Sequence, residues 1–187
     1  GELVAPCSAC YLNLRKTEDK MAHYPKLNKK VNQALAAGGL EYEPGTLRVR
    51  HILDVLTEDV GLDEIKAKVT KPLAGLRVAP YYGCMIARPY NDEYNPEYPT
   101  RMDHLLEALG ATVIDFPMKT HCCGGHMTQI SEETAFELIR RILQNAADYK
   151  ADLIAVICPM CQLNLDVFQP QTNAMFNASF DMPVLFF

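Results

Sequence analysis

All seven cysteines of the chain fall into short motifs whose spacing suits metal or redox chemistry. They comprise two Cys-x-x-Cys pairs, one adjacent pair and a single cysteine that follows a glycine: Cys7 and Cys10, Cys158 and Cys161, Cys122 and Cys123, and Cys84. An odd number leaves one thiol outside any set of disulfides, and nothing in the sequence is typical of a secreted chain. We therefore interpret the cysteines as reduced metal ligands or reactive thiols.

Thiolates at this spacing are compatible with several kinds of centre. A thioredoxin-like redox pair or buried structural cysteines would explain one Cys-x-x-Cys pair, but they explain its recurrence poorly. Zinc often binds four cysteines in two such pairs, yet adjacent Cys122 and Cys123 do not easily occupy two corners of one tetrahedron. In a multinuclear iron–sulfur cluster, adjacent thiolates can bind different irons. The ferredoxin-type cubane run is absent. The sequence favours another iron–sulfur cluster, with zinc or no metal as alternatives.

Each cysteine motif follows a predicted strand. Buried strands are expected over residues 75–82, 112–116, 152–157 and 183–187, and helices over residues 101–109 and 131–146, with a short helix near residue 161. In open α/β sheets, ligands collect at the carboxyl ends of the parallel strands. The sequence therefore predicts a short parallel sheet flanked by helices, with five cysteines meeting in one pocket: Cys84, Cys122, Cys123, Cys158 and Cys161.

The start of the chain repeats the third predicted strand and its motif. Residues 4–14 and 155–165 both read as an apolar strand followed by Cys-x-x-Cys-x-Leu-Asn-Leu. Such repeats mark duplicated units, so Cys7 and Cys10 should close a second cysteine set. We expect the chain to be the latter part of a duplicated protein. Residues 1–72 would hold the end of the first unit and a helical connection over residues 13–71, and residues 73–187 the second unit.

Composition and charge argue against several partners. The 187 residues carry a formal net charge of −5, which gives no basic footprint for nucleic acid or an anionic membrane surface. The longest apolar runs have about five residues, whereas a membrane-spanning helix needs roughly 20. We expect a cytoplasmic protein with no membrane span and no nucleic-acid partner.

Glycines and arginines near the cysteines are candidates for supporting roles. Gly124 and Gly125 follow the cysteine pair, either as an ordinary turn or to bring backbone N–H groups close to cluster sulfur. Arg88 and Arg101 bracket a loop rich in tyrosine and proline, which is either solvated surface or a cover for the pocket. An arginine there would suit an anionic substrate through paired hydrogen bonds.

These motifs together resemble the cysteine-rich (CCG) domains in the B subunit of heterodisulfide reductase. The resemblance extends through nearly the whole chain. It is carried by residues 81–84, 88–89, 99–103, 122–125, 158–166 and 183–185, with residues 7–10 as the end of a first motif and residues 49–56 and 60–62 as a helix between the motifs.

The resemblance implies a cofactor, a reaction and partners. The family has two noncubane [4Fe–4S] clusters, each held by the five cysteines of one motif, between which a disulfide substrate is cleaved. The five cysteines from Cys84 onward would hold one cluster and act catalytically through it, and Cys7 and Cys10 would be remaining ligands of the other. Electrons would come from a ferredoxin-like iron–sulfur partner similar to the C subunit of heterodisulfide reductase. Because the first motif lacks its upstream cysteines here, we expect this chain alone to be inactive.

Related CCG domains leave other substrates open. They also occur in thiol:fumarate reductases, in some succinate dehydrogenase subunits and in iron–sulfur subunits of lactate and glycolate oxidation. A second hypothesis from another class is a zinc-stabilised structural or interaction module.

Overall fold

In the part of the chain that the structure describes, six short strands form two separate parallel sheets. The computed structural model describes residues 1–88, 90 and 95–187. The strands are β1 Glu2–Ala5, β2 Arg48–His51, β3 Arg77–Tyr81, β4 Thr112–Val113, β5 Leu153–Val156 and β6 Val184–Phe186. β1 pairs with β2, and the larger sheet has the order β4-β3-β5-β6 with every pair parallel. The predicted fold class, a short parallel sheet flanked by helices, is confirmed.

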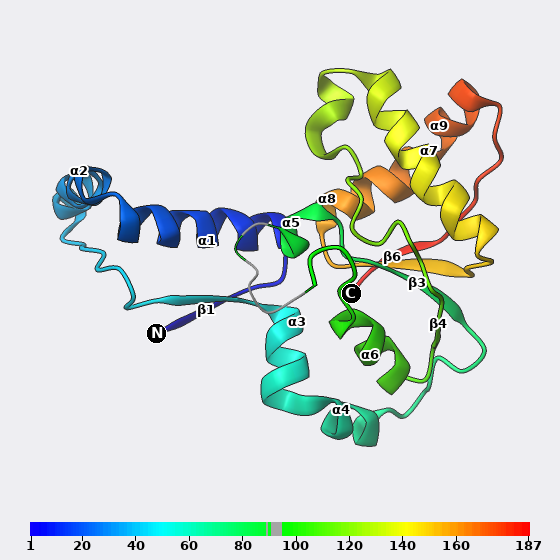
Figure 1. Ribbon diagram of the computed structural model, residues 1–187, viewed down its shortest axis with the longest axis horizontal. Helices are drawn as coiled ribbons and strands as arrows, with labels where there is room; N and C mark the ends of the chain where they lie inside the picture. The colour runs from blue at the N-terminus through cyan, green and yellow to red at the C-terminus, as the bar shows by residue number, and fades with distance from the viewer. Residues whose placement is uncertain (89, 91–94) are drawn as a thin grey trace.

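Helices cover both faces of the larger sheet, and two more extend away from it. The α-helices are α1 Ser8–His23, α2 Pro25–Leu35, α3 Ile52–Asp54, α4 Leu62–Lys68, α5 Cys84–Ala87, α6 Arg101–Ala108, α7 Glu132–Asp148, α8 Pro159–Gln162 and α9 Gln169–Phe176. Helices α7 and α9 lie on one side of the sheet and α6 and α4 on the other, while α1 and α2 form an arm (Figure 1). Tighter 3-10 turns cover Ala36–Gly38 and Gly125–Gln129, and wider π-helical turns cover Val55–Gly61 and Leu163–Val167.

Strand β5 and the residue after it divide the core between the two faces. Ile154 and Val156 belong to the apolar cluster under α7, whereas Ala155 and Ile157 belong to the cluster under α6. Successive side chains of a strand point to opposite faces, so a strand with helices on both sides is apolar throughout. This explains the uninterrupted apolar run before Cys158.

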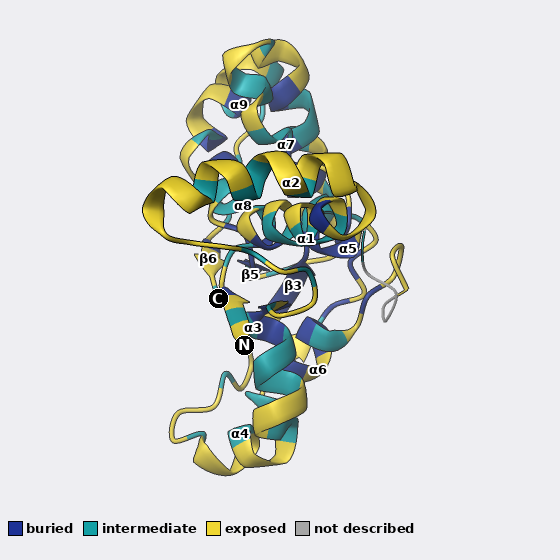
Figure 2. Cartoon of the chain, turned by 90° about the vertical axis from the view of Figure 1, so that its left-hand side faces the viewer, coloured by how far each residue is buried: buried dark blue, intermediate teal, exposed yellow. Residues whose placement is uncertain are grey.

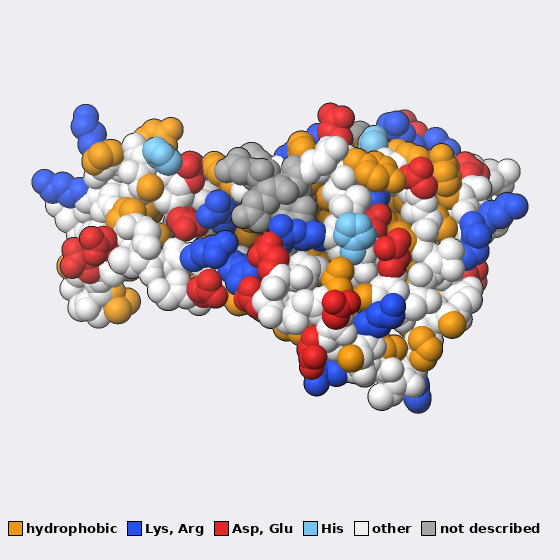
Figure 3. All heavy atoms as spheres, turned by 60° about the horizontal axis from the view of Figure 1, so that its bottom comes forward, with side chains coloured by type: hydrophobic (Ala, Val, Ile, Leu, Met, Phe, Trp, Pro, Cys, Tyr) orange, Lys and Arg blue, Asp and Glu red, His pale blue; other side chains and the backbone are white. Residues whose placement is uncertain are grey.

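The arm is the least buried part of the chain. Helix α2 has no buried residue, and Figure 2 shows it as mostly exposed or intermediate. Lys, Arg, Asp and Glu side chains are interspersed over the face shown in Figure 3. Within the described residues, no helix is both long enough and apolar enough to cross a membrane.

Two sequence predictions were wrong in their bounds. The connection over residues 13–71, expected to be helical, contains strand β2 at Arg48–His51, because these residues pair with β1 in the register Ala5↔His51. The strand expected over residues 112–116 ends at Val113, at the edge of the sheet. Ile114 still donates its backbone N–H to Val78 O at 3.0 Å, but Asp115 is exposed and the ladder stops there.

The internal repeat extends further in space than in sequence. In the first copy β1 leads into Cys7, helix α1 and then the parallel strand β2; in the second β5 leads into Cys158, helix α8 and then the parallel strand β6. Each copy is therefore a strand, a Cys-x-x-Cys helix start, and a second strand parallel to the first. The division into units at residue 72 stays a prediction.

Candidate functional site

Five cysteines line a single cavity near the carboxyl ends of β3 and β5. The residues lining it are Ser8, Tyr82, Cys84, Met85, Cys122, Cys123, Gly125, Cys158, Met160 and Cys161. The structure thus brings together the whole predicted set of five, with Met85, Met160 and Tyr82 as apolar walls. Cys7 and Cys10 do not line this cavity.

Gly83 lets the end of β3 approach the other cysteines closely. Its φ is +69°, and a Cβ at this position would lie 3.2 Å from Cys161 Sγ, which is tighter than ordinary contact. The backbone N–H groups of Tyr82 and Gly83 both donate to Lys119 O, at 2.8 and 3.0 Å. Cys84 is consequently held opposite the segment that carries the adjacent cysteines.

The adjacent cysteines face different partners. Cys122 is exposed and Cys123 is buried, and the Sγ atoms of Cys123 and Cys161 share a thiol hydrogen bond at 3.4 Å. Gly124 has a φ of +94°, a conformation that favours glycine, and its N–H donates to Cys122 Sγ at 3.4 Å. The turn therefore separates two neighbouring sulfur atoms and gives one of them a backbone donor.

Hydrogen bonds between thiols prepare three of the five cysteines to ionise. A hydrogen bond from Cys84 lowers the pKa of Cys122 to about 6, and one from Cys161 lowers the pKa of Cys158 to about 5. The bond to Cys161 also lowers the pKa of Cys123, although its burial opposes this. The same thiol contacts raise the pKa values of Cys84 and Cys161, so these two cysteines keep their protons. Thiolates are the form that binds metals.

The first Cys-x-x-Cys motif packs beside the second. The Ser8 hydroxyl donates to Ile157 O at 2.9 Å, directly before Cys158, and Cys7 packs against the apolar cluster that contains Cys158. Burial raises the pKa of Cys7 to about 11, and the charge of Cys158 acts in the same direction. Cys10 is exposed. The two motifs of the repeat therefore meet at one point.

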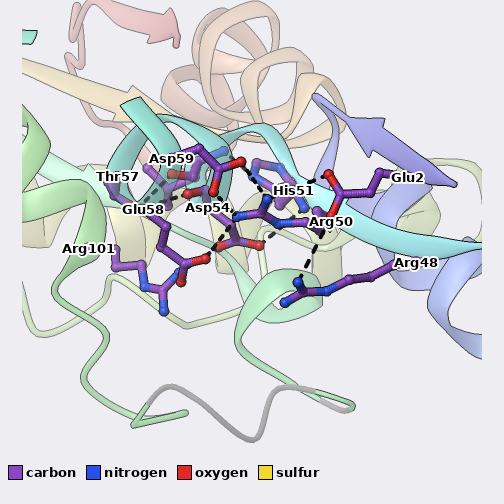
Figure 4. Close-up of polar contacts among 10 residues, drawn as sticks. Glu2, Arg48, Arg50, His51, Asp54, Thr57, Glu58, Asp59 and Arg101 are labelled. Atoms are coloured by element: carbon purple, nitrogen blue, oxygen red, sulfur yellow. Dashed lines mark hydrogen bonds and ion pairs between the residues drawn. The ribbon is translucent and has the colours of Figure 1, made fainter. Parts of the chain in front are cut away.

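The two predicted arginines lie in different environments. Arg88 donates to Thr120 O at 3.3 Å, and its charge contributes to the lowered pKa of Cys122. Arg101 forms ion pairs with Asp54, at 3.1 Å, and with Glu58. It belongs to the polar network of Figure 4 and does not line the cysteine cavity. Pro89 and residues 91–94 of the tyrosine-rich loop lie outside the described residues.

That network joins the end of β2 to the turn after α3. The Arg50 guanidinium, almost fully buried, donates to Asp59 at 2.6 and 2.9 Å and to Glu58 at 2.9 Å. Glu58 also pairs with Arg101 at the start of α6. Figure 4 shows these side chains converging from three elements, so Arg101 links α6 to the segment that follows β2.

Sequence reasoning missed two buried polar groups behind the cysteines. Lys119 is fully buried and donates to Asp103 Oδ1 at 2.5 Å, while the Tyr82 hydroxyl donates to Asp103 Oδ2 at 2.6 Å. Asn164 is buried against the turn that carries Cys123. No local pattern marks Lys119, but Asn164 stands in the repeated Leu-Asn-Leu segment.

The donor set fits an iron–sulfur cluster. Five thiol groups, from the ends of β3 and β5 and from the loop after β4, face one cavity, and the adjacent pair points to different partners. A multinuclear cluster, in which different thiolates bind different irons, matches this arrangement.

Comparisons with known proteins show what the chain is similar to. Residues 78–166 match the family described as "CCG: Cysteine-rich domain". The chain is 34% identical over 185 residues to the 8-methylmenaquinol:fumarate reductase membrane anchor subunit of Wolinella succinogenes. It is 34% identical over 190 residues to a protein of Archaeoglobus profundus that is named as similar to the B subunit of heterodisulfide reductase. It is 31% identical over 188 residues to the B subunit of the ferredoxin/F(420)H(2)-dependent CoB-CoM heterodisulfide reductase of Methanosarcina acetivorans.

These matches cover 98% of this chain but only 62–63% of the relatives. A hypothetical protein from Helicobacter pylori has a similar fold, with a TM-score of 0.72 and 14% identity, over 95% of this chain and 31% of the other. The chain therefore contains a CCG cysteine-rich domain. Its resemblance to the B subunits of heterodisulfide reductases is confirmed by these relatives.

Proposed function

We propose that this chain binds a noncubane [4Fe–4S] cluster as part of a reductase that cleaves a disulfide. The observation that carries the proposal is the single cavity lined by five cysteines, which come from the ends of β3 and β5 and from the loop after β4. Relatives named after the B subunit of heterodisulfide reductases support the choice of reaction. The ligands would be Cys84, Cys122, Cys123, Cys158 and Cys161.

When bound, such a cluster accepts and donates single electrons. The chain's own residues prepare its site. The lowered pKa values of Cys122 and Cys158 supply thiolates near neutral pH. The Gly124 N–H donates to Cys122 Sγ, and such donors tune the potential of a bound metal group. Arg88 places positive charge near the exposed Cys122, where an anionic disulfide or thiol substrate would approach.

This chain spans less than two thirds of the length of its relatives. Its partners are therefore proposed for the whole protein. We propose a ferredoxin-like iron–sulfur subunit as the electron donor. Cys7 and Cys10 would contribute to a second cluster beside the first, because their motif packs against Ile157 and Cys158.

A second candidate function is electron transfer in a fumarate reductase. The relative from Wolinella succinogenes, named a subunit of such an enzyme, matches this chain with 34% identity. Both candidates require the same cysteine site; they differ in the oxidant, and the name of this relative also gives another electron donor, 8-methylmenaquinol.

Anaerobic metal analysis tests the shared part of the proposal. After reconstitution with iron and sulfide, the chain should hold about four of each, with the visible absorption of an iron–sulfur protein. Cys123→Ser should lose most of this iron, because Cys123 is buried in the cavity. Cys10→Ser is the matched control, since Cys10 is exposed and outside the cavity, and this chain contains only two cysteines of the second set, Cys7 and Cys10.

Two outcomes would contradict the proposal. One is stoichiometric zinc in anaerobically purified protein together with no uptake of iron, which indicates a structural module. The other is equal loss of iron in both variants, which means that the iron is not held by the five-cysteine cavity.

A further inference from the structure

Asn164 is the polar side chain that connects the Cys158–Cys161 motif with the segment of the adjacent cysteines, Cys122 and Cys123. It lies three residues after Cys161 and is 1% exposed. Its Nδ2 atom lies 3.0 Å from Cys123 O, 2.9 Å from Gly125 O and 3.5 Å from Cys123 Sγ. One amide group thus contacts the carbonyl oxygens at both ends of the turn from Cys123 to Gly125, and also the sulfur atom of Cys123.

The backbone carbonyls of this turn need such a donor. Cys123 is buried, and Gly124 and Gly125 both have positive φ values, so the turn forms no regular ladder at this point. Buried carbonyl groups without a partner are costly. The two hydrogen atoms of the Asn164 amide match the two carbonyl oxygens, which fixes the position of the turn relative to α8.

The repeat supplies a natural comparison for Asn164. Asn13 stands at the equivalent position after Cys10, but it is exposed and donates only to Ala9 O, at 3.0 Å, one helical turn earlier. The backbone at Asn164 is π-helical over Leu163–Val167, whereas Asn13 lies within the regular helix α1. The same motif therefore carries a buried contact in the complete cysteine set and a local, exposed one in the other copy.

We propose that Asn164 is a positioning residue, whose carboxamide holds the turn from Cys123 to Gly125 against the Cys158–Cys161 motif and so keeps the Cys123 sulfur facing Cys161. In the loaded protein, and resting on the proposed function, the same amide shares one of its two hydrogens between a carbonyl oxygen and the ligand sulfur of Cys123, which lies 3.5 Å from Asn164 Nδ2. Donors of this kind support metal retention and favour the reduced, more negative form of the group.

Hydrogen exchange in the metal-free, reduced chain tests the positioning role directly. Asn164→Ala removes both carbonyl contacts, so amide exchange in the segment from His121 to Ile130 should become at least about fivefold faster. Asn13→Ala should leave this segment unchanged. A second control is Asn173→Ala, because Asn173 makes two equally short bonds, of 2.8 Å, to Phe180 away from the cysteines.

Exchange in this segment that is unchanged in Asn164→Ala would overturn the positioning role. So would acceleration of the same size in Asn173→Ala, because it would reflect general loss of stability.

Iron retention and redox potential test the contact with the ligand sulfur. Asn164→Asp has the same shape but accepts hydrogen bonds only, so reconstituted protein should lose iron to a chelator about 10- to 100-fold faster. The remaining cluster should have a more negative midpoint potential, while Asn13→Asp should match the wild type. Wild-type retention and potential in Asn164→Asp would overturn the sulfur contact. If the wild type itself binds no iron, the proposed function fails, and the exchange measurement still decides the role of Asn164.

Discussion

The buried ion pair between Lys119 and Asp103 should carry a large share of the stability around the cysteines. The Lys119 side chain is fully buried, and its ammonium group donates to Asp103 Oδ1 at 2.5 Å and to Pro99 O at 3.1 Å. Lys119→Met keeps the apolar stem but leaves the Asp103 carboxylate without its counter-charge. Removing one partner of a buried pair costs about 3–5 kcal/mol. For a chain of this size, that corresponds to a fall in Tm of roughly 6–20 °C.

Urea unfolding of the reduced, metal-free chain, followed by circular dichroism, measures this cost. The double variant Lys119→Met with Asp103→Leu should lose less than the sum of the two single variants, because it leaves no uncompensated charge. Lys68→Met is the control: Lys68 pairs with Glu64 at 3.0 Å on the surface, and its loss should cost under about 0.5 kcal/mol. A cost below about 1 kcal/mol for Lys119→Met, or strict additivity in the double variant, would refute the reasoning.

Two further predictions concern single positions near the site. Gly83→Ala should lower the free energy of unfolding by about 1–3 kcal/mol in the same assay and reduce iron retention, because the residue has a φ of +69° and its Cβ would meet Cys161 Sγ at 3.2 Å; unchanged stability would contradict the close approach. Burial lowers the pKa of His51 from 6.5 to about 4. The unfolded chain therefore binds a proton first as pH falls. The contribution of neutral His51 should be fully present above pH 6.5 and decline by about 3 kcal/mol toward pH 4. His51→Gln should flatten the dependence between pH 5 and 6.5 in urea titrations, and an equally steep profile in this variant would show that another group titrates.

Local sequence patterns were sufficient to predict most of the larger sheet, β4-β3-β5-β6. Apolar runs predicted β3, β5 and β6, and helical periodicity predicted α6 and α7 to within about two residues. Strand β2 was missed because its partner β1 lies more than 40 residues earlier, and a short run such as Arg48–His51 has no period of its own. Pairing over such a distance is a tertiary effect that no local window contains.

The cysteine cavity was predictable for a topological reason, and its supporting contacts were not. Parallel strands bring their carboxyl ends to one edge, so strand order alone gathers Cys84 and Cys158. The roles of Lys119 and Arg101 depend instead on partners elsewhere in the chain: Asp103 lies 16 residues from Lys119, and Asp54 lies 47 residues from Arg101. Side-chain pairs of this kind follow from packing, which the sequence pattern does not display.

The contact between the two cysteine motifs gives the repeat a functional meaning within the proposal. The Ser8 backbone N–H and hydroxyl both donate to Ile157 O, at 3.3 and 2.9 Å, so the start of α1 is fixed on the residue that precedes Cys158. Burial, together with the charge of Cys158, raises the pKa of Cys7, which agrees with the packing of Cys7 against the cluster that contains Cys158. Within the proposal, this contact would hold the ligands of the two centres side by side.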